Sequence, residues 1–282
     1  MLTRRHIRIK VMQSLYSYFS TDSKDVSNSE IIMLKHFDAV VELKLAIISL
    51  LVELVDYADN FYQDGKNKYF PSPTDLNPNT RLVKNKIISG IKDNKDLMHR
   101  ISKSSYIWLD NDHDVIRKIF TVIIKSELYV SYLKSDDTSS ECDKKFIIDI
   151  MNEVVLNDHL IHHILEEKSI YWIDDLPFIA TVIFGEIKDN INMNPRGSFK
   201  HSSDKDFALD LFRNTIKNNT DYESIIARFA KNWEIDRIAK MDQIFLKMAF
   251  AEILCIHDLP IKVSLNEYIE ISKYYSTAKS KL

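Results

Sequence analysis

Residues 232–275 read NWEIDRIAKMDQIFLKMAFAEILCIHDLPIKVSLNEYIEISKYY, and this stretch is the most informative part of the sequence. Its first half has apolar side chains at helical spacing, which predicts an amphipathic helix over about residues 236–256. Pro260 follows and cannot continue that helix, because proline lacks the amide hydrogen that a helix interior uses. The residues on the predicted side are Ile238, Met241, Phe245, Met248, Glu252 and Cys255.

A second helix is expected to begin at Ser264. Ser264 and Glu267 have the spacing of a capping box, in which the serine hydroxyl accepts from the amide three residues on and the glutamate reaches back. We therefore interpret Asn266 and Glu267 as structural residues. Two further helices are predicted upstream, over about residues 204–218 and 221–233.

The remainder of the chain is also helical in pattern. The whole chain has only four glycines among 282 residues, which is too few for the turns and close backbone approaches of most α/β enzymes and β-sandwiches. The sequence therefore predicts an all-α protein, with polar loops at about 20–28 and 64–80 and a linker at 192–203. The other predicted helices cover about residues 3–19, 29–61, 80–102, 112–134, 140–168 and 172–190.

Charge is distributed unevenly along the chain. The formal net charge is −3, yet residues 1–21 contain four cations and no acid, so the remainder has a charge of −7. A basic first helix on an acidic body favours an anionic partner for that helix. No uncharged apolar run reaches the ~18 residues of a membrane span, so we expect no membrane segment. Cys142 and Cys255 lack the spacing of a disulfide or zinc framework, and we expect a cytoplasmic protein.

Both ends of the chain resemble the NusB family of bacterial transcription antitermination factors. The resemblance covers roughly residues 1–20 and 204–282, in the order and at the termini that the family shows. The matching runs are RRHIRIKVMQSLY at residues 4–16, Trp233, FLKMAFAEI at 245–253, PIKVSLNE at 260–267, and Lys273 with Tyr274.

The sequence departs from the family pattern in three ways. Ile7 stands where alanine is usual, and Lys247 stands where arginine is usual. Family members continue past the position of Leu282 with another helix, so we expect the natural protein to extend further. The middle of the chain is much longer than in typical members and does not align with them.

The resemblance implies an all-α fold of two packed helical bundles with extra inserted helices. We predict an N-terminal bundle over residues 1–195, which includes the arginine-rich first helix, and a C-terminal bundle over residues 204–282. It also implies a protein that is not an enzyme and uses no cofactor. Family members bind single-stranded boxA-type RNA together with the ribosomal protein NusE, in an antitermination complex on RNA polymerase.

The first helix supplies the predicted RNA-binding residues. Cations without neighbouring acids suit phosphate oxygens, and arginine adds a planar fork for phosphate or a base edge. The alternative is a solvated, frayed helix end whose cations oppose the helix dipole, and only the resemblance favours RNA. Tyr16 could equally be a half-buried core residue. The predicted set is Arg4, Arg5, Arg8, Lys10, Gln13 and Tyr16.

Two acids on the helix over residues 236–256 are candidates for partner binding. Asp242 matches an acidic position near the RNA and partner surface of relatives. Glu252 is the second candidate, although an acid that forms an ion pair inside the bundle is the stronger interpretation for it. Trp233 is interpreted as a core aromatic residue.

Other chemistries have weak support. His159 and His163 lie four residues apart, but a zinc site needs three or four convergent ligands, so a solvated helix face is favoured. Phosphate-loop, dinucleotide, nucleophile-elbow and metalloprotease motifs are absent from the sequence. Two other functions stay open. One is the NusB-like RNA-binding domain of a ribosomal RNA methyltransferase, which would need a Rossmann-like domain. The other is a protein-interaction scaffold, in which the inserted helices at about residues 25–195 have replaced RNA binding.

Overall fold

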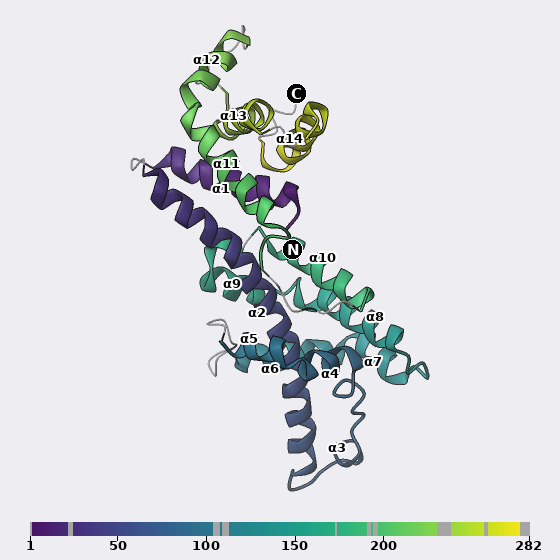
Figure 1. Cartoon of the computed structure of the whole chain (residues 1–282). Coiled ribbons are helices and arrows are strands. Elements are labelled where there is room, and N and C mark those ends of the chain that lie inside the picture. Colours follow the sequence, from purple (N-terminus) through teal and green to yellow (C-terminus); the bar gives the residue numbers. More distant parts are fainter. Residues whose placement is uncertain are drawn as a thin grey trace. The chain divides into compact units, whose positions relative to one another are not determined.

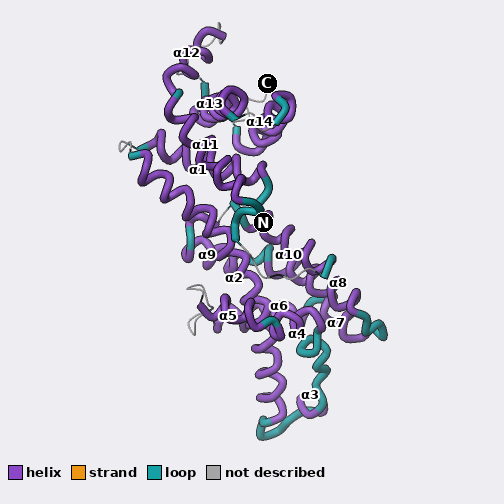
Figure 2. The backbone as a smooth tube through the Cα atoms, in the orientation of Figure 1, coloured by secondary structure: helices purple, strands orange, loops and turns teal. Residues whose placement is uncertain are grey.

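The fold is all-α in the part of the chain that the structure describes, as predicted. The computed structural model describes residues 2–21, 25–103, 108, 113–172, 174–190, 193, 197–229, 238–256 and 259–276. These residues form helices joined by loops and turns, and no strand occurs among them (Figure 1, Figure 2). Within these ranges, no helix is long and apolar enough to cross a membrane.

The helices group into two compact units. The terminal unit contains both ends of the chain, Met1–Asp38 and Gly197–Leu282, and the middle unit is Ala39–Arg196. The predicted division placed the first helix in a bundle of residues 1–195. The structure instead groups helix α1 (Arg4–Ser20) with the C-terminal helices.

In the terminal unit, α1 packs against α11, α13 and α14, and α12 packs against α13. The predicted apolar stripe explains the position of α1, because Ile7, Val11 and Leu15 are fully buried. Each such side chain contributes about 1.5–3 kcal/mol through its removal from water. The C-terminal helices are α11 (Ser202–Lys217), α12 (Asn219–Phe229), α13 (Lys240–Cys255) and α14 (Ile261–Tyr275).

Helix α14 begins three residues earlier than predicted. Pro260 is its N-cap and Ile261 its first residue, so Ser264 and Glu267 lie inside the helix. The predicted capping box is therefore wrong. Proline is tolerated at a helix start because the first amides of a helix have no partner within it. The side chains of Ser264 and Glu267 instead bind other helices.

In the middle unit, polar capping residues divide the segments that were predicted as long helices. Ser126 interrupts the predicted helix over 112–134, because its hydroxyl accepts from the Tyr129 amide at 3.2 Å. Asp158 interrupts the one over 140–168 in the same way. The elements are α2 (Val26–Lys66), which begins in the terminal unit, α3 (Pro73–Leu76), α4 (Lys86–Asp93), α5 (Lys95–Lys103), α6 (His113–Lys125), α7 (Glu127–Lys134), α8 (Ser140–Ile150), a π-helical turn (Met151–Val155), α9 (His159–Lys168), a 3-10 turn (Ile170–Trp172) and α10 (Leu176–Lys188).

A buried histidine is expected to make the terminal unit sensitive to acid. His36 on α2 is 8% exposed, and its Nδ1 lies 3.3 Å from the Ser14 hydroxyl. Burial, with the charge of Lys10 adding to it, lowers the pKa of His36 from 6.5 to about 4. The unfolded chain therefore takes up a proton that the folded unit resists. Stability should fall as the pH drops from 6.5 towards 4, by up to about 3 kcal/mol.

Unfolding measured across this pH range tests the assignment of His36. His36→Gln keeps a hydrogen-bonding group near Ser14 but cannot titrate. Its free energy of unfolding should therefore fall less than that of the wild type as the pH drops from 6.5 towards 4. An identical decline in both proteins would contradict it.

Candidate nucleic-acid interface

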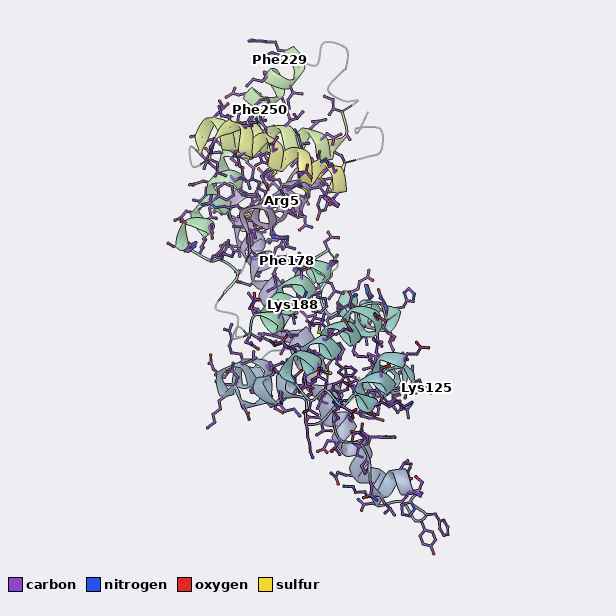
Figure 3. All side chains as sticks on the ribbon, turned by 90° about the vertical axis from the view of Figure 1, so that its right-hand side faces the viewer. Arg5, Lys125, Phe178, Lys188, Phe229 and Phe250 are labelled. Carbon is purple, nitrogen blue, oxygen red and sulfur yellow. The ribbon has the colours of Figure 1, made fainter. Side chains whose placement is uncertain are left out.

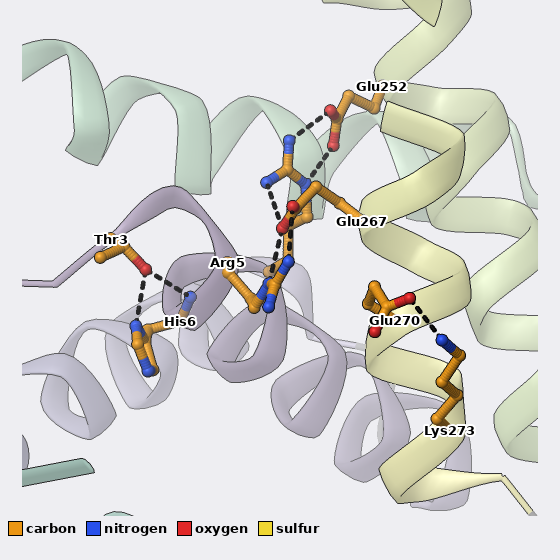
Figure 4. Close-up of polar contacts among 8 residues, drawn as sticks. Thr3, Arg5, His6, Glu252, Glu267, Glu270 and Lys273 are labelled. Atoms are coloured by element: carbon orange, nitrogen blue, oxygen red, sulfur yellow. Dashed lines mark hydrogen bonds and ion pairs between the residues drawn. The ribbon is translucent and has the colours of Figure 1, made fainter. Parts of the chain in front are cut away.

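Helix α1 begins without acids of its own. Thr3 is its N-cap and accepts from the His6 amide at 3.4 Å, and the same hydroxyl lies 2.6 Å from His6 Nδ1 (Figure 4). The first turn contains arginines and no acidic residue. Positive charges at this end of a helix interact unfavourably with the positive end of the helix dipole. The carboxylates that compensate these charges come from other helices of the terminal unit.

The guanidinium group of Arg8 lies fully inside the terminal unit. Its Nε and Nη2 donate to the two carboxylate oxygens of Glu252 at 2.8 and 2.6 Å. The two side chains are only 1% and 2% exposed. Glu252 also accepts from the Ser264 hydroxyl at 2.6 Å and the Tyr268 hydroxyl at 2.8 Å (Glu252 is labelled in Figure 4). These four hydrogen bonds offset the free-energy cost of removing the carboxylate from water.

Electrostatics keeps this carboxylate ionised. Burial alone would raise the pKa of Glu252, because it penalises the charged form. The hydrogen bond and charge of Arg8, with the hydroxyls of Ser264 and Tyr268, outweigh burial and hold the pKa of Glu252 below its ordinary value. Burial and the charge of Glu252 raise the pKa of Tyr268 well above its ordinary value, so its hydroxyl remains a donor. We call these four residues the buried network.

Tyr268→Phe is expected to lower the free energy of unfolding by about 1.5–3 kcal/mol, because it removes a hydrogen bond to a buried charge. Denaturant unfolding followed by circular dichroism measures this difference. Tyr274→Phe is the matched control, since Tyr274 lies on the same helix with its side chain 83% exposed, and its stability should not change. Wild-type stability in Tyr268→Phe would count against the network.

The other two arginines of α1 are also paired. Arg5 is 47% exposed, and its Nε and Nη2 donate to Glu267 at 2.8 and 2.7 Å (Figure 4). These hydrogen bonds hold the pKa of Glu267 below its ordinary value. Arg4 is 30% exposed and donates from Nε to Asp204 at 2.9 Å. Its guanidinium carbon lies 4.2 Å from the centre of the Phe207 ring.

The cations of this turn have no acidic neighbours in sequence, but in the folded terminal unit all three arginines pair with carboxylates of other helices. Arg8 is enclosed by the buried network, and Lys10 is also buried, with 3% exposure. In this arrangement neither side chain can reach a phosphate in solvent. Arg8 is placed to fix α1 on α13 through Glu252, and of the four predicted cations Arg5 is the most accessible.

One side of α1 remains accessible. Arg5 and Tyr16 are about three helical turns apart and therefore lie on the same side, with Gln13 beside them. Tyr16 is 43% exposed, and the Nζ of Lys240 lies 5.7 Å from its ring centre. Lys240 also donates to the Phe19 carbonyl at 2.9 Å. This side combines cations, an amide and an aromatic face, a set of groups suited to single-stranded RNA.

Lys240 was not among the predicted residues. It is more than two hundred residues from Tyr16 in sequence, and only the packing of α13 on α1 brings the two together. A lysine at the start of a helix carries no pattern that would have indicated this contact.

The two acids predicted to bind a partner lie in different surroundings. Glu252 is inside the buried network, in agreement with the interpretation of a structural acid. Asp242 lies in the first turn of α13, where a negative charge interacts favourably with the helix dipole. Its carboxylate accepts a hydrogen bond from the Ser276 hydroxyl. Asp242 is partly exposed, and its partner-binding role stays a prediction. Trp233 lies outside the described residues. Within those residues, no group of three or more histidine, cysteine or acidic side chains could hold a metal ion.

The terminal unit is a helical module in which a buried ion pair positions a helix with a polar and aromatic outer side. The profile of the NusB family matches residues 184–282. A transcription antitermination protein NusB from Clostridium kluyveri is 35% identical over 115 residues, which cover 36% of this chain and 73% of that relative. The chain therefore belongs to the NusB family.

Other relatives match a shorter part. The protein of the same name from Salinibacter ruber is 49% identical over 78 residues, 28% of this chain and 49% of the relative. The one from Chloroherpeton thalassium is 46% identical over 76 residues, 27% of this chain and 36% of the relative. The chain thus spans half or less of the length of these two relatives. No solved structure matches the chain.

The family match includes α11 to α14 and leaves out α1 and most of the middle unit. The buried network joins the first helix to the matched part, because Arg8 comes from α1 while Glu252, Ser264 and Tyr268 come from α13 and α14. The terminal unit is therefore one structure that combines both segments.

Proposed function

We propose that this protein is a transcription antitermination factor that binds boxA-type RNA together with NusE. The observation that carries the proposal is the similarity of its C-terminal helices to proteins named transcription antitermination protein NusB. The relatives are named for a role in transcription and not for a reaction, which supports a binding function without catalysis. The protein would act in the cytoplasm, within the antitermination complex on RNA polymerase.

The accessible side of α1 is the proposed RNA surface. The pair between Arg5 and Glu267 is half-exposed, and such pairs contribute only about 0–1 kcal/mol, so a phosphate can replace the carboxylate at small cost. Tyr16 offers a ring face on which a base can stack. Gln13 offers an amide to a base edge, and Lys240 adds a second cation beside the ring. Arg4 would contribute charge, while Arg8 would position the helix.

NusE is the proposed protein partner, and Asp242 belongs to the proposed contact. The chain outside residues 1–21 has a charge of −7, which suits a basic protein. Two weak binders held together raise each other's effective concentration at the RNA, so the pair should bind more tightly than either alone.

Co-purification of this chain with NusE, followed by binding to a boxA-type oligonucleotide and to a scrambled oligonucleotide of equal length, tests the function. We expect a complex with NusE and a preference of the complex for the boxA-type sequence. Failure of the chain to bind NusE and any RNA would contradict the proposal.

A second candidate, a protein-interaction scaffold without RNA binding, is favoured by one observation. All three arginines of the first helix are paired with carboxylates of the protein itself. The same experiment separates the candidates, because a scaffold would bind a protein partner but show no affinity for either oligonucleotide.

A further inference from the structure

A pocket of about 370 Å³ lies within the middle unit. Its walls come from α4 and α5, from the first residue of α8, and from the end of α10 with the residues that follow it. Helix α8 packs against both α4 and α10 (Figure 1). The volume falls in the range of small-molecule sites, ~300–1,000 Å³. Helices α4, α5 and α8 lie outside the family match.

A glycine in the middle of a helix borders this pocket. Gly90 lies inside α4, where glycine is the least favourable residue after proline because it loses the most backbone freedom on folding. A Cβ at this position would meet no other atom within 4 Å, so packing within the described protein does not require glycine. Glycine is favoured where a ligand approaches the backbone closely. The residue therefore keeps the pocket open, although it lowers the stability of the helix.

Much of the pocket wall is apolar. Five apolar side chains line it, and all except Ile87 are buried in the packing of the middle unit. Contact with them would remove an aliphatic molecule from water, which favours binding in proportion to the apolar area covered. The five side chains are those of Ile87, Ile91, Leu97, Ile187 and Met193.

Charge in the pocket favours a ligand with a negative group. Lys86 Nζ donates to the neutral carbonyl of Thr138 at 2.8 Å and forms no ion pair with another described residue. The acid in the wall, Glu186, is neutralised by Lys44, whose Nζ donates to Glu186 Oε1 at 2.7 Å. The wall therefore has one uncompensated positive charge, at Lys86.

Two neutral donors also line the pocket. The hydroxyl of Ser140 and the side-chain amide of Asn190 form no hydrogen bond with another described residue, so both can donate to a ligand. Asn190 has a φ of 52°, a left-handed conformation that asparagine tolerates better than most residues, and it turns the chain at the end of α10. One ammonium group and two neutral donors suit a singly charged carboxylate better than a doubly charged phosphate.

We propose that this pocket binds a small aliphatic carboxylate, with its chain against the apolar wall and its head group at Lys86. Gly90 leaves room for the chain, and Ser140 and Asn190 supply further donors to the carboxylate oxygens. The pair of Lys44 and Glu186 prevents the wall from repelling the head group. A ligand of this size binds weakly, with a dissociation constant on the order of 1 mM.

Saturation-transfer NMR titration of the full chain, without NusE or RNA, tests the proposal with three probes of equal chain length: octanoate, 1-octanol and octylammonium. The wild-type protein should bind octanoate about 5-fold more tightly than 1-octanol, because only octanoate forms an ion pair with Lys86. Octylammonium should bind most weakly, since Lys86 repels it.

The variant Gly90→Leu fills the pocket and should bind octanoate at least about 10-fold more weakly, because the apolar wall is then covered by the protein itself. Its melting temperature should not fall, since leucine favours a helix more than glycine does. The matched control is Gly185→Leu, the same change inside α10, where a side chain also meets no atom within 4 Å and does not line the pocket. This control should bind octanoate like the wild type.

The variant Lys86→Gln should bind octanoate about 5-fold more weakly and 1-octanol with unchanged affinity. Lys125→Gln is its matched control, because Lys125 on α6 is an exposed lysine of the same unit that does not line the pocket (Figure 3). This control should bind all three probes like the wild type.

Three results would overturn the proposal. The first is a wild-type protein that does not bind octanoate at millimolar concentrations. The second is wild-type affinity for octanoate in Gly90→Leu or in Lys86→Gln. The third is tighter binding of octylammonium than of octanoate, because the pocket would then select a cation through Glu186.

Discussion

Replacing Arg8 with alanine is expected to lower the free energy of unfolding of the terminal unit by about 3–5 kcal/mol, because Glu252 would keep a buried charge without its counterion. The pair is bidentate, with distances of 2.8 and 2.6 Å, and almost fully buried. This loss should exceed that from any other single arginine of α1. Arg8→Lys should also be destabilised, since lysine cannot form the two parallel hydrogen bonds.

Hydrogen exchange of peptides from α1 and α13 is the suitable measurement, because a chain with two units need not unfold in one step. Arg5→Ala is the control, and its half-exposed pair should cost less than about 1 kcal/mol. The double change of Arg8→Met with Glu252→Leu should recover part of the loss, because no unpaired charge remains. Wild-type protection of α1 in Arg8→Ala would show that the pair does not fix this helix.

The double variant Arg5→Ala with Tyr16→Ala is expected to bind boxA-type RNA more weakly than the wild type when each chain is in complex with NusE. A base stacked on an aromatic ring contributes about 1–3 kcal/mol, or roughly 5- to 150-fold in affinity, through Tyr16 alone. Loss of one phosphate contact at Arg5 should reduce the slope of log affinity against log salt by about 0.7. A salt titration of the double variant and the wild type measures both effects.

Arg213→Ala is the matched control for Arg5. Arg213 on α11 is 52% exposed and forms a bidentate pair with Glu30 at 2.6 and 2.7 Å, so it resembles the pair of Arg5 and Glu267. This variant should bind RNA with the affinity and salt slope of the wild type. A salt slope in Arg213→Ala that falls as much as in Arg5→Ala alone would indicate a general effect of charge and not a site on α1.

Much of the helical fold was predictable because an amphipathic helix has apolar residues at a regular spacing in its sequence. The stripe of Ile7, Val11 and Leu15 predicted α1 and its buried side. The place of α1 among the C-terminal helices was not predictable, since sequence proximity assigned it to the N-terminal half. The divisions of the middle helices were missed because single capping residues such as Ser126 and Asp158 outweighed a continuous apolar pattern.

The prediction of the candidate site failed in part for an identifiable reason. Arg8 precedes Val11, Met12 and Leu15 by three, four and seven residues, so it shares their side of the helix, and all three are fully buried. That spacing indicated a buried guanidinium group, but the partner, Glu252, is 244 residues away and could not be identified locally. The capping box failed similarly, because the spacing of Ser264 and Glu267 also lets both side chains face α1 and α13.

Photo-cross-linking tests two linked statements together, namely that the buried Arg8 fixes α1 and that the neighbouring, exposed side of this helix contacts RNA. The complex of the full chain with NusE would be irradiated on a boxA-type RNA containing 4-thiouridine, and the cross-linked peptides identified by mass spectrometry. We expect cross-links in residues 4–20, centred on Tyr16, and in the first turn of α13 at Lys240. Cross-links confined to the middle unit, or none at all, would contradict this expectation.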